Sequence, residues 1–183
     1  QIIRKYRNPE YDAIDLDFNL AILDNYEGIL QDVNVWIDNR DTIYVKTESF
    51  KLATDDDFLI VYGVNNTQTG FATFINVSLY GDELWNGVTG TVFTNELQYP
   101  ADEYFPEYDK NSRNCYVVKM TRRATERNEI IIPYSTGNPK GSAYGVDNNQ
   151  KVFLVIRMYV NQETKVASVP FDIIWGHAIL FTK

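Results

Sequence analysis

Cysteine and histidine each occur once among the 183 residues, and this scarcity excludes several kinds of site. Cys115 has no second thiol for an internal disulfide, and one thiol cannot build a cysteine-based metal site. His177 alone likewise excludes a zinc site built from several histidines. A Ser-His-Asp arrangement stays formally open, although no serine lies on a recognisable nucleophile turn. We therefore predict no metal site, no cofactor and no catalytic residue.

The sequence around these two residues indicates structural roles for both. Cys115 opens a run of β-forming residues, where a lone cysteine usually behaves as a small buried hydrophobe. His177 follows Gly176 in another such run, so we expect a packed or edge histidine beside a β-bulge.

Long apolar runs and basic charge are also scarce. No apolar run approaches the ~18 residues that a membrane-crossing helix needs. The N-terminal residues show no signal-peptide pattern. We interpret Gln1 as the start of a processed or excised piece. The net charge of −8 argues against nucleic acid or an anionic membrane surface as partner, since both need clustered Lys and Arg. The one basic cluster, Lys119 with Arg122, Arg123 and Arg127, is expected to be a solvated loop rather than an anion site.

Aromatic residues are abundant, and they point to β structure. Tyr, Phe and Trp make up 14% of the chain and favour pleated, half-buried surfaces. Beyond residue 16, short β-branched and aromatic runs alternate with turn residues, a pattern typical of a sandwich or barrel. We predict one domain over residues 1–183, an all-β, two-sheet, jelly-roll-like β-sandwich with about nine or ten strands. Residues 1–16 are expected to form an N-terminal arm that lies over the domain or over a neighbour.

The predicted strands follow the apolar runs, with one short helical turn expected at 101–104. They span Ile29–Ile37, Thr42–Lys46, Phe58–Gly63, Gly70–Tyr80, Val88–Phe93, Cys115–Thr121, Glu129–Tyr134, Val152–Val160 and Asp172–Phe181. The strand at 152–160 is apolar on both faces, so we expect it to be central and covered twice. Arg157 stands among those apolar residues, and a buried charge needs a partner, which Asp172 or Glu129 can supply.

Several polar segments are candidate calcium-binding or glycosylation sites. The acidic run 55–57 lacks the spacing of a calcium loop, so we expect an exposed acidic turn there. Two glycosylation sequons begin at Asn65 and Asn76. The first falls in a predicted turn, which makes Asn65 the candidate glycosylation site and favours an extracellular or secreted location. The second falls within a predicted strand and is interpreted as a chance match.

The segment 94–114 is the strongest functional candidate. Loops longer than ~15 residues are usually functional or disordered, and this one is too aromatic to be disordered. Its candidate partner- or ligand-binding residues are Tyr99, Tyr104, Phe105 and Tyr108. Such residues suit a protein interface or stacking on sugar rings. The alternative is a packed loop that closes one end of the sandwich.

Several segments resemble those of a group of uncharacterised, hypothetical β-rich proteins. The resemblance is carried by Phe58-Leu59-Ile60-Val61-Tyr62-Gly63-Val64-Asn65, Thr69-Gly70-Phe71-Ala72-Thr73, Ser78-Leu79-Tyr80, Tyr116-Val117-Val118-Lys119, Arg157-Met158-Tyr159-Val160 and Glu163-Thr164-Lys165-Val166. It spans residues 58–183. No activity is attached to that group, so the resemblance implies a coherent β module and no functional residues.

These features predict a non-enzymatic structural or assembly module that self-associates or docks into a larger complex. Its expected contacts are the aromatic loop and the terminal segments, because a terminal strand such as 172–181 can add to a neighbour's sheet edge. The alternative prediction is a carbohydrate-binding sandwich that uses Tyr99, Tyr104, Tyr108 and Trp85. A hydrolase with a carboxylate pair ranks third, because 25 acidic residues make such pairs unavoidable and uninformative.

Overall fold

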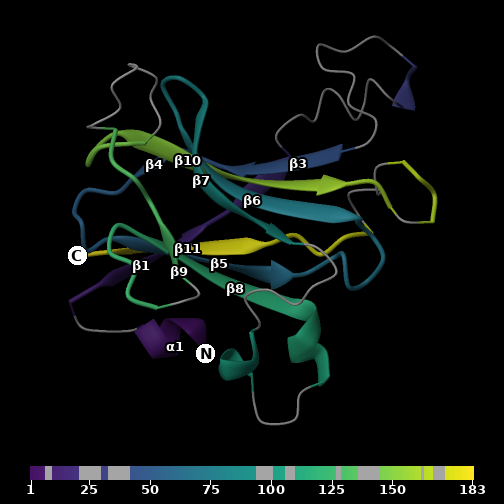
Figure 1. The fold of residues 1–183 in the computed structure, drawn as a ribbon, viewed down its shortest axis with the longest axis horizontal. Helices are drawn as coiled ribbons and strands as arrows, with labels where there is room; N and C mark the ends of the chain where they lie inside the picture. Colours follow the sequence, from purple (N-terminus) through teal and green to yellow (C-terminus); the bar gives the residue numbers. More distant parts are fainter. Residues whose placement is uncertain are drawn as a thin grey trace.

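Two stacked β-sheets form the body of the protein in the computed structural model (Figure 1). The structure describes residues 1–6, 10–20, 30–32, 42–93, 101–105, 110–126, 129–135, 145–161, 163–166 and 172–183. These ranges contain eleven strands and almost no helix. The predicted all-β, two-sheet sandwich is therefore confirmed, with more strands than expected.

Each sheet is a mixture of segments distant in the sequence. Sheet A contains, in spatial order, β1 (Asp12–Leu16), β11 (His177–Thr182), β5 (Phe58–Val64), β8 (Cys115–Thr121) and β9 (Glu129–Ile131). Sheet B contains β2 (Phe18–Leu20), β3 (Thr42–Thr47), β10 (Lys151–Tyr159), β6 (Phe74–Gly81) and β7 (Asn86–Phe93), with β4 (Phe50–Lys51) beside β10. Among the described strands, β8 and β9 pair in parallel and all other pairs are antiparallel.

Most predicted strands occur where expected, although three are shorter. The strands predicted at 70–80 and 172–181 begin only at Phe74 and His177, and the one at 129–134 ends at Ile131. Residues 70–73 instead complete a turn in which Gly70 has a φ of +84°, a conformation that glycine adopts at little cost. The predicted strand 29–37 is wrong for residues 30–32, because Leu30 is helical and residues 31–32 form a turn, and its remainder lies outside the described residues.

Three short helices have defined bounds in the described part of the chain. They are α1 (Ile2–Tyr6), η1 (Asp102–Tyr104) and η2 (Lys110–Asn114). The predicted helical turn at 101–104 is confirmed by η1, whereas α1 was not predicted. None of the helices in the described ranges is long and apolar enough to cross a membrane.

The N-terminal arm pairs with strands of the sandwich in its own chain. Strand β1 pairs with β11 in sheet A, and after Asp17 the chain continues as β2, which pairs with β3 in sheet B. The segment 12–20 therefore supplies an edge strand to each of the two sheets. The C-terminal strand β11 lies between β1 and β5 in its own sheet, and its addition to a neighbour's sheet edge stays a prediction.

Sheet A is buried on both faces because its strands alternate between two apolar clusters. In β5, Leu59 and Val61 face the core between the sheets, whereas Phe58 and Ile60 face a second cluster on the outer side. That outer cluster is covered by α1 and by the segment 101–105, which lie beneath sheet A in Figure 1. Sheet A is therefore the middle of three layers, between sheet B and the layer formed by α1 and the segment 101–105.

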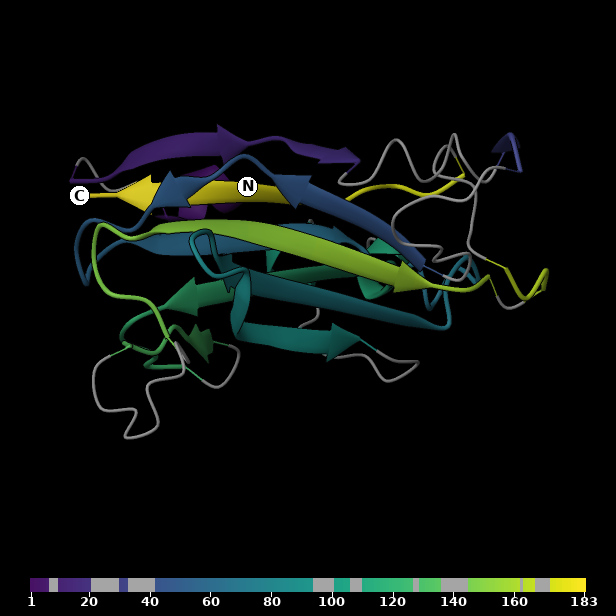
Figure 2. The ribbon, with the colours of Figure 1, turned by 90° about the horizontal axis from the view of Figure 1, so that it is seen from above.

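Sheet B has a different environment. Its inner face fills the core with residues such as Val45, Val77 and Leu154, all fully buried. No described helix or strand crosses its outer face, which is seen from above in Figure 2. Strand β10 is central in this sheet, as predicted, but its second face is covered by neighbouring side chains instead of by another layer.

Candidate functional site

A pocket of about 470 Å³ lies on the outer side of sheet A. It opens where β5, β8 and the residues before β11 meet the segment 101–105, and its walls include Tyr62, Phe105, Trp175 and His177. Small-molecule sites commonly have volumes of roughly 300–1,000 Å³ and predominantly apolar walls. The size and the lining of this pocket both fit that class.

Two predicted site residues, Tyr104 and Phe105, form part of this pocket wall. The Tyr104 and Tyr6 hydroxyls are hydrogen-bonded at 2.8 Å, and Lys5 Nζ lies 4.7 Å from the centre of the Tyr104 ring. Lys5 also forms a 2.7 Å ion pair with Glu103. Burial and the hydrogen bond with Tyr6 raise the pKa of Tyr104 above its usual range. The N-terminal helix thus holds this part of the loop against sheet A.

The other two predicted loop residues, Tyr99 and Tyr108, lie outside the described residues. The described part of the aromatic segment is packed, as the closing-loop alternative expects, but it covers the outer face of sheet A and not an end of the sandwich. Because Tyr104 and Phe105 also line the pocket, their role in binding stays a prediction.

Cys115 and His177 line the same pocket but do not meet as a nucleophile and base. His177 pairs with Tyr62 on β5, while Cys115 on β8 pairs with Val64 two residues farther along β5. Strands two positions apart are about 10 Å from one another, and a catalytic pair needs hydrogen-bond contact. The two side chains therefore contribute separately to the pocket wall.

His177 was expected to be a packed or edge histidine beside a β-bulge, and both the edge position and the bulge are wrong. Its strand is internal in sheet A, and its pairing with Tyr62 is regular. The imidazole is exposed and stacks on the Tyr62 ring, with the ring centres 5.4 Å apart. Cys115 is half-buried instead of fully buried.

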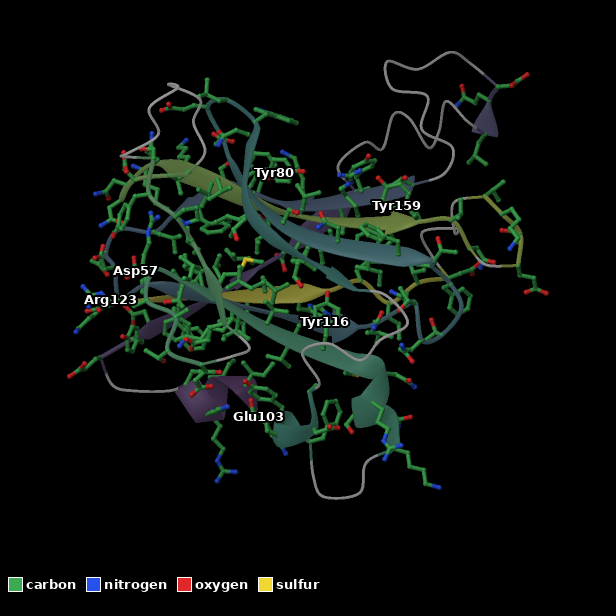
Figure 3. The ribbon with its side chains drawn as sticks, viewed as in Figure 1. Asp57, Tyr80, Glu103, Tyr116, Arg123 and Tyr159 are labelled. Atoms are coloured by element: carbon green, nitrogen blue, oxygen red, sulfur yellow. The ribbon has the colours of Figure 1, made fainter. Side chains whose placement is uncertain are left out.

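One arginine of the basic cluster pairs with the acidic run 55–57 at one end of the sandwich, where Figure 3 labels Arg123 and Asp57. Arg123 contacts Asp55 and Asp56, each at 3.3 Å. Arg122 is 8% exposed and donates hydrogen bonds to two backbone carbonyls, so the expected solvated loop is wrong at this position. Asp57 is 0% exposed, so the expected exposed acidic turn is also wrong there. Arg127 lies outside the described residues.

Asn65 occupies the predicted turn but is 1% exposed. Its Oδ1 accepts a 2.7 Å hydrogen bond from the Thr67 hydroxyl, and its Nδ2 is buried. A glycan must attach to that nitrogen, and this fold leaves it no access. The turn is confirmed, whereas the candidate glycosylation site is not compatible with the folded chain.

The outer face of sheet B gathers aromatic rings around Arg157. The guanidinium carbon lies 5.3 Å from the ring centres of both Tyr44 and Tyr159, and Arg157 is hydrogen-bonded to the Tyr159 hydroxyl. The expected ion pair is wrong, because Glu129 pairs with Lys119 on the other sheet. No carboxylate within the described ranges pairs with Arg157. Its desolvation lowers the pKa, but the neighbouring tyrosines outweigh that effect and raise it.

A second aromatic group lies at the other end of the same face. Phe153 is only 2% exposed because Tyr80 stacks on it at 5.6 Å and Trp85 contacts it edge-on at 5.4 Å. Lys46 Nζ lies 5.3 Å from the centre of the Phe153 ring. Trp85 itself is 67% exposed, on the turn that connects β6 to β7. Figure 3 shows Tyr80 and Tyr159 along this sheet.

Of the residues on the outer face of sheet B, only Trp85 was predicted from the sequence to bind a ligand. The signal for the remainder was the alternate set in β10, where Phe153 and Tyr159 lie on the same face as Arg157, four residues before it and two residues after it. A strand face that carries both aromatic rings and a charged side chain is expected to be half-exposed, because the rings favour burial and the charge favours water. The contributions of Tyr44 and Tyr80 depend on strand order and register, which the sequence does not display.

No group of His, Cys, Asp and Glu side chains in the described ranges is arranged to hold a metal ion. Comparison with known proteins yields no matching family model, no similar curated protein and no similar solved structure. The resemblance to a group of hypothetical β-rich proteins therefore stays a prediction, and function must be argued from the two surfaces themselves.

Proposed function

We propose that the chain is a non-enzymatic, carbohydrate-binding β-sandwich module whose binding surface is the outer face of sheet B. The observation that supports this most strongly is Arg157, held between Tyr44 and Tyr159 on a sheet face that no described helix or strand crosses. A guanidinium fixed by two rings is a pre-oriented hydrogen-bond donor, so little conformational entropy is lost when a ligand hydroxyl or carboxylate meets it.

The combination of rings and polar groups favours sugar over an apolar protein surface. Aromatic rings offer an apolar face to the C–H groups of a sugar ring and keep a polar edge for its hydroxyls. Asn76 and Ser78 add amide and hydroxyl groups to the face beside Arg157, and they are linked by a 2.5 Å hydrogen bond. Each kind of group that a sugar presents thus has a matching partner here.

The length of the surface favours an extended oligosaccharide. Phe153 and Tyr159 are six residues apart on β10, which corresponds to about 20 Å along a strand. Trp85 stands at the Phe153 end, and Phe74 packs edge-on against Tyr159 at 5.2 Å at the opposite end. Stacking positions at both ends with donors between them suit a chain of several sugar units.

Self-association is the second candidate function, and one observation favours it. The eight-residue strand β7 is at the border of sheet B, where it pairs with β6 on one side. A long border strand is a template for a strand from another copy. A Thr89→Lys change should lower the multimer fraction in light scattering on a sizing column, since lysine on a border strand opposes such pairing. An unchanged fraction, or no multimer in the parent, would exclude this route.

Affinity gel electrophoresis tests the proposed glycan binding. Gels containing soluble glucan, xylan, mannan, galactan or pectin should include at least one that retards the parent chain. Trp85→Ala should lose most of that retardation, because the exposed indole offers a large apolar face for a sugar ring to stack on. Tyr104→Ala is the matched control, since Tyr104 lies on the opposite layer. Equal loss in both variants, or no retardation of the parent, would contradict the proposal.

A further inference from the structure

We infer that the pocket on the outer side of sheet A is a second binding site, for a small, uncharged, largely apolar molecule that contains a ring. The site is distinct from the sheet B surface because the two lie on opposite outer faces of the sandwich. It does not depend on whether the protein binds glycans.

The charge of the ligand follows from the pocket walls. Among the described residues that line the pocket, none has an Asp, Glu, Lys or Arg side chain, although such residues make up 23% of the chain. A charged ligand would lose its hydration on entering and find no side chain of opposite charge among the described lining residues, which is unfavourable by several kcal/mol. An uncharged molecule does not meet this penalty.

The shape of the pocket favours a flat, ring-containing ligand. The stacked Tyr62 and His177 rings form one wall, and Phe105 belongs to the facing segment 101–105. Aromatic rings favour offset or edge-on contacts with other rings, so a ring placed between the walls gains contacts on both sides.

The volume identifies the occupant as a small molecule. A space of about 470 Å³ accommodates a ligand of ordinary drug or metabolite size, whereas a folded partner needs a much larger surface. Ile174 at the rim is 62% exposed, and its apolar side chain is placed to cover such a ligand. His177 is the polar residue best placed to add one hydrogen bond, because its imidazole is exposed at the wall.

The uncharged dye N-phenyl-1-naphthylamine can test the site on the intact chain. Its emission rises in apolar surroundings, and saturable one-to-one binding is expected. Cys115 is the only cysteine in the sequence and lines the pocket, so its reaction with a chromogenic disulfide reagent reports occupancy directly. At a dye concentration ten times Kd, that reaction should slow about tenfold, since roughly a tenth of the sites are then empty.

Ile174→Trp should weaken dye binding by roughly tenfold or more, because an indole at the rim fills the entrance. Ile131→Trp is the matched control, as Ile131 is 57% exposed on β9 and does not line the pocket. Absence of saturable binding would overturn the inference. So would equal binding by the two variants, or an unchanged rate of Cys115 modification at saturating dye.

Discussion

The buried carboxylate of Asp57 accepts a 3.1 Å hydrogen bond from the backbone N–H of Lys183, the C-terminal residue of the chain. The same carboxylate accepts hydrogen bonds from the backbone N–H groups of Ala53 and Thr54, at 2.6 and 3.0 Å, and from the Thr54 hydroxyl at 2.7 Å. One side chain therefore fixes both the turn that precedes β5 and the end of β11. We interpret Asp57 as a structural carboxylate.

Asp57→Ala should lower the free energy of unfolding by about 2–4 kcal/mol, because it leaves several buried donors without an acceptor. Asp56→Ala is the neighbouring control. Asp56 is half-exposed and makes surface ion pairs with Arg123 and Lys183, which typically contribute less than about 1 kcal/mol. Urea unfolding of both variants measures the difference, and equal losses would refute the structural role of Asp57.

The stability of the protein should also depend on the protonation of Asp57. Burial alone would raise the pKa of this carboxyl, but the hydrogen bonds from Thr54, Lys183 and Ala53 outweigh it and lower the pKa. A carboxyl with a lowered pKa stabilises the fold above its unfolded value near 3.9, and this contribution is lost as pH falls through the folded value. Below about pH 4, the stability of the parent should therefore fall more steeply than that of Asp57→Ala. Parallel curves in urea unfolding between pH 5 and 2 would be the contrary result.

Removal of residues 1–16 should destabilise the chain and promote association. The truncation deletes β1 and thereby turns β11 into an unpaired sheet border, which is a template for intermolecular pairing. It also removes Ile2, Tyr6 and Tyr11 from the cluster on the outer side of sheet A. Light scattering should show a larger mean mass for the truncated chain, together with a lower melting temperature. An arm that drives assembly would give the reverse order, a multimer when intact and a monomer when trimmed.

Gly63→Ala should lower the free energy of unfolding by about 1–3 kcal/mol, as overpacking does in other cores. A Cβ at this position would lie 2.9 Å from the Gly176 Cα and 3.2 Å from the Tyr116 hydroxyl, and the backbone atom cannot rotate away. Gly87→Ala is the matched control, because the nearest atom to its Cβ would be 3.9 Å away. If thermal unfolding shifts equally in the two variants, close packing between β5 and the segment before β11 is not the cause.

The predictable strands are those whose own sequence contains both the β-forming run and the polar residues that end it. Cys115–Thr121 was predicted with the observed bounds because it is a strong β-forming run with polar residues before it. Strand β1 was missed because Asp12 and Asp15 interrupt its apolar pattern. It forms because β11 supplies an antiparallel partner along its whole length, and such pairing is a long-range property.

The misplaced site residues have a similar physical origin. Turn chemistry at Asn65 predicted the backbone conformation but not the burial of the turn beside the segment before β11, where Asn66 donates to the Ile174 carbonyl. For Arg157, electrostatics predicted an acidic partner, whereas strand register places Tyr44 directly beside it. Register and strand order decide which side chains become neighbours, and neither is readable from local pattern.

The most direct test of glycan binding compares two arginine variants in a gel that retards the parent chain. Arg157→Gln removes the guanidinium at the centre of the sheet B surface, and Arg123→Gln removes an arginine that is exposed at the acidic turn. We predict that Arg157→Gln migrates as it does without polysaccharide, while Arg123→Gln is retarded like the parent, with both variants folded by thermal unfolding. Full retardation of Arg157→Gln, or equal loss in both variants, would contradict the account.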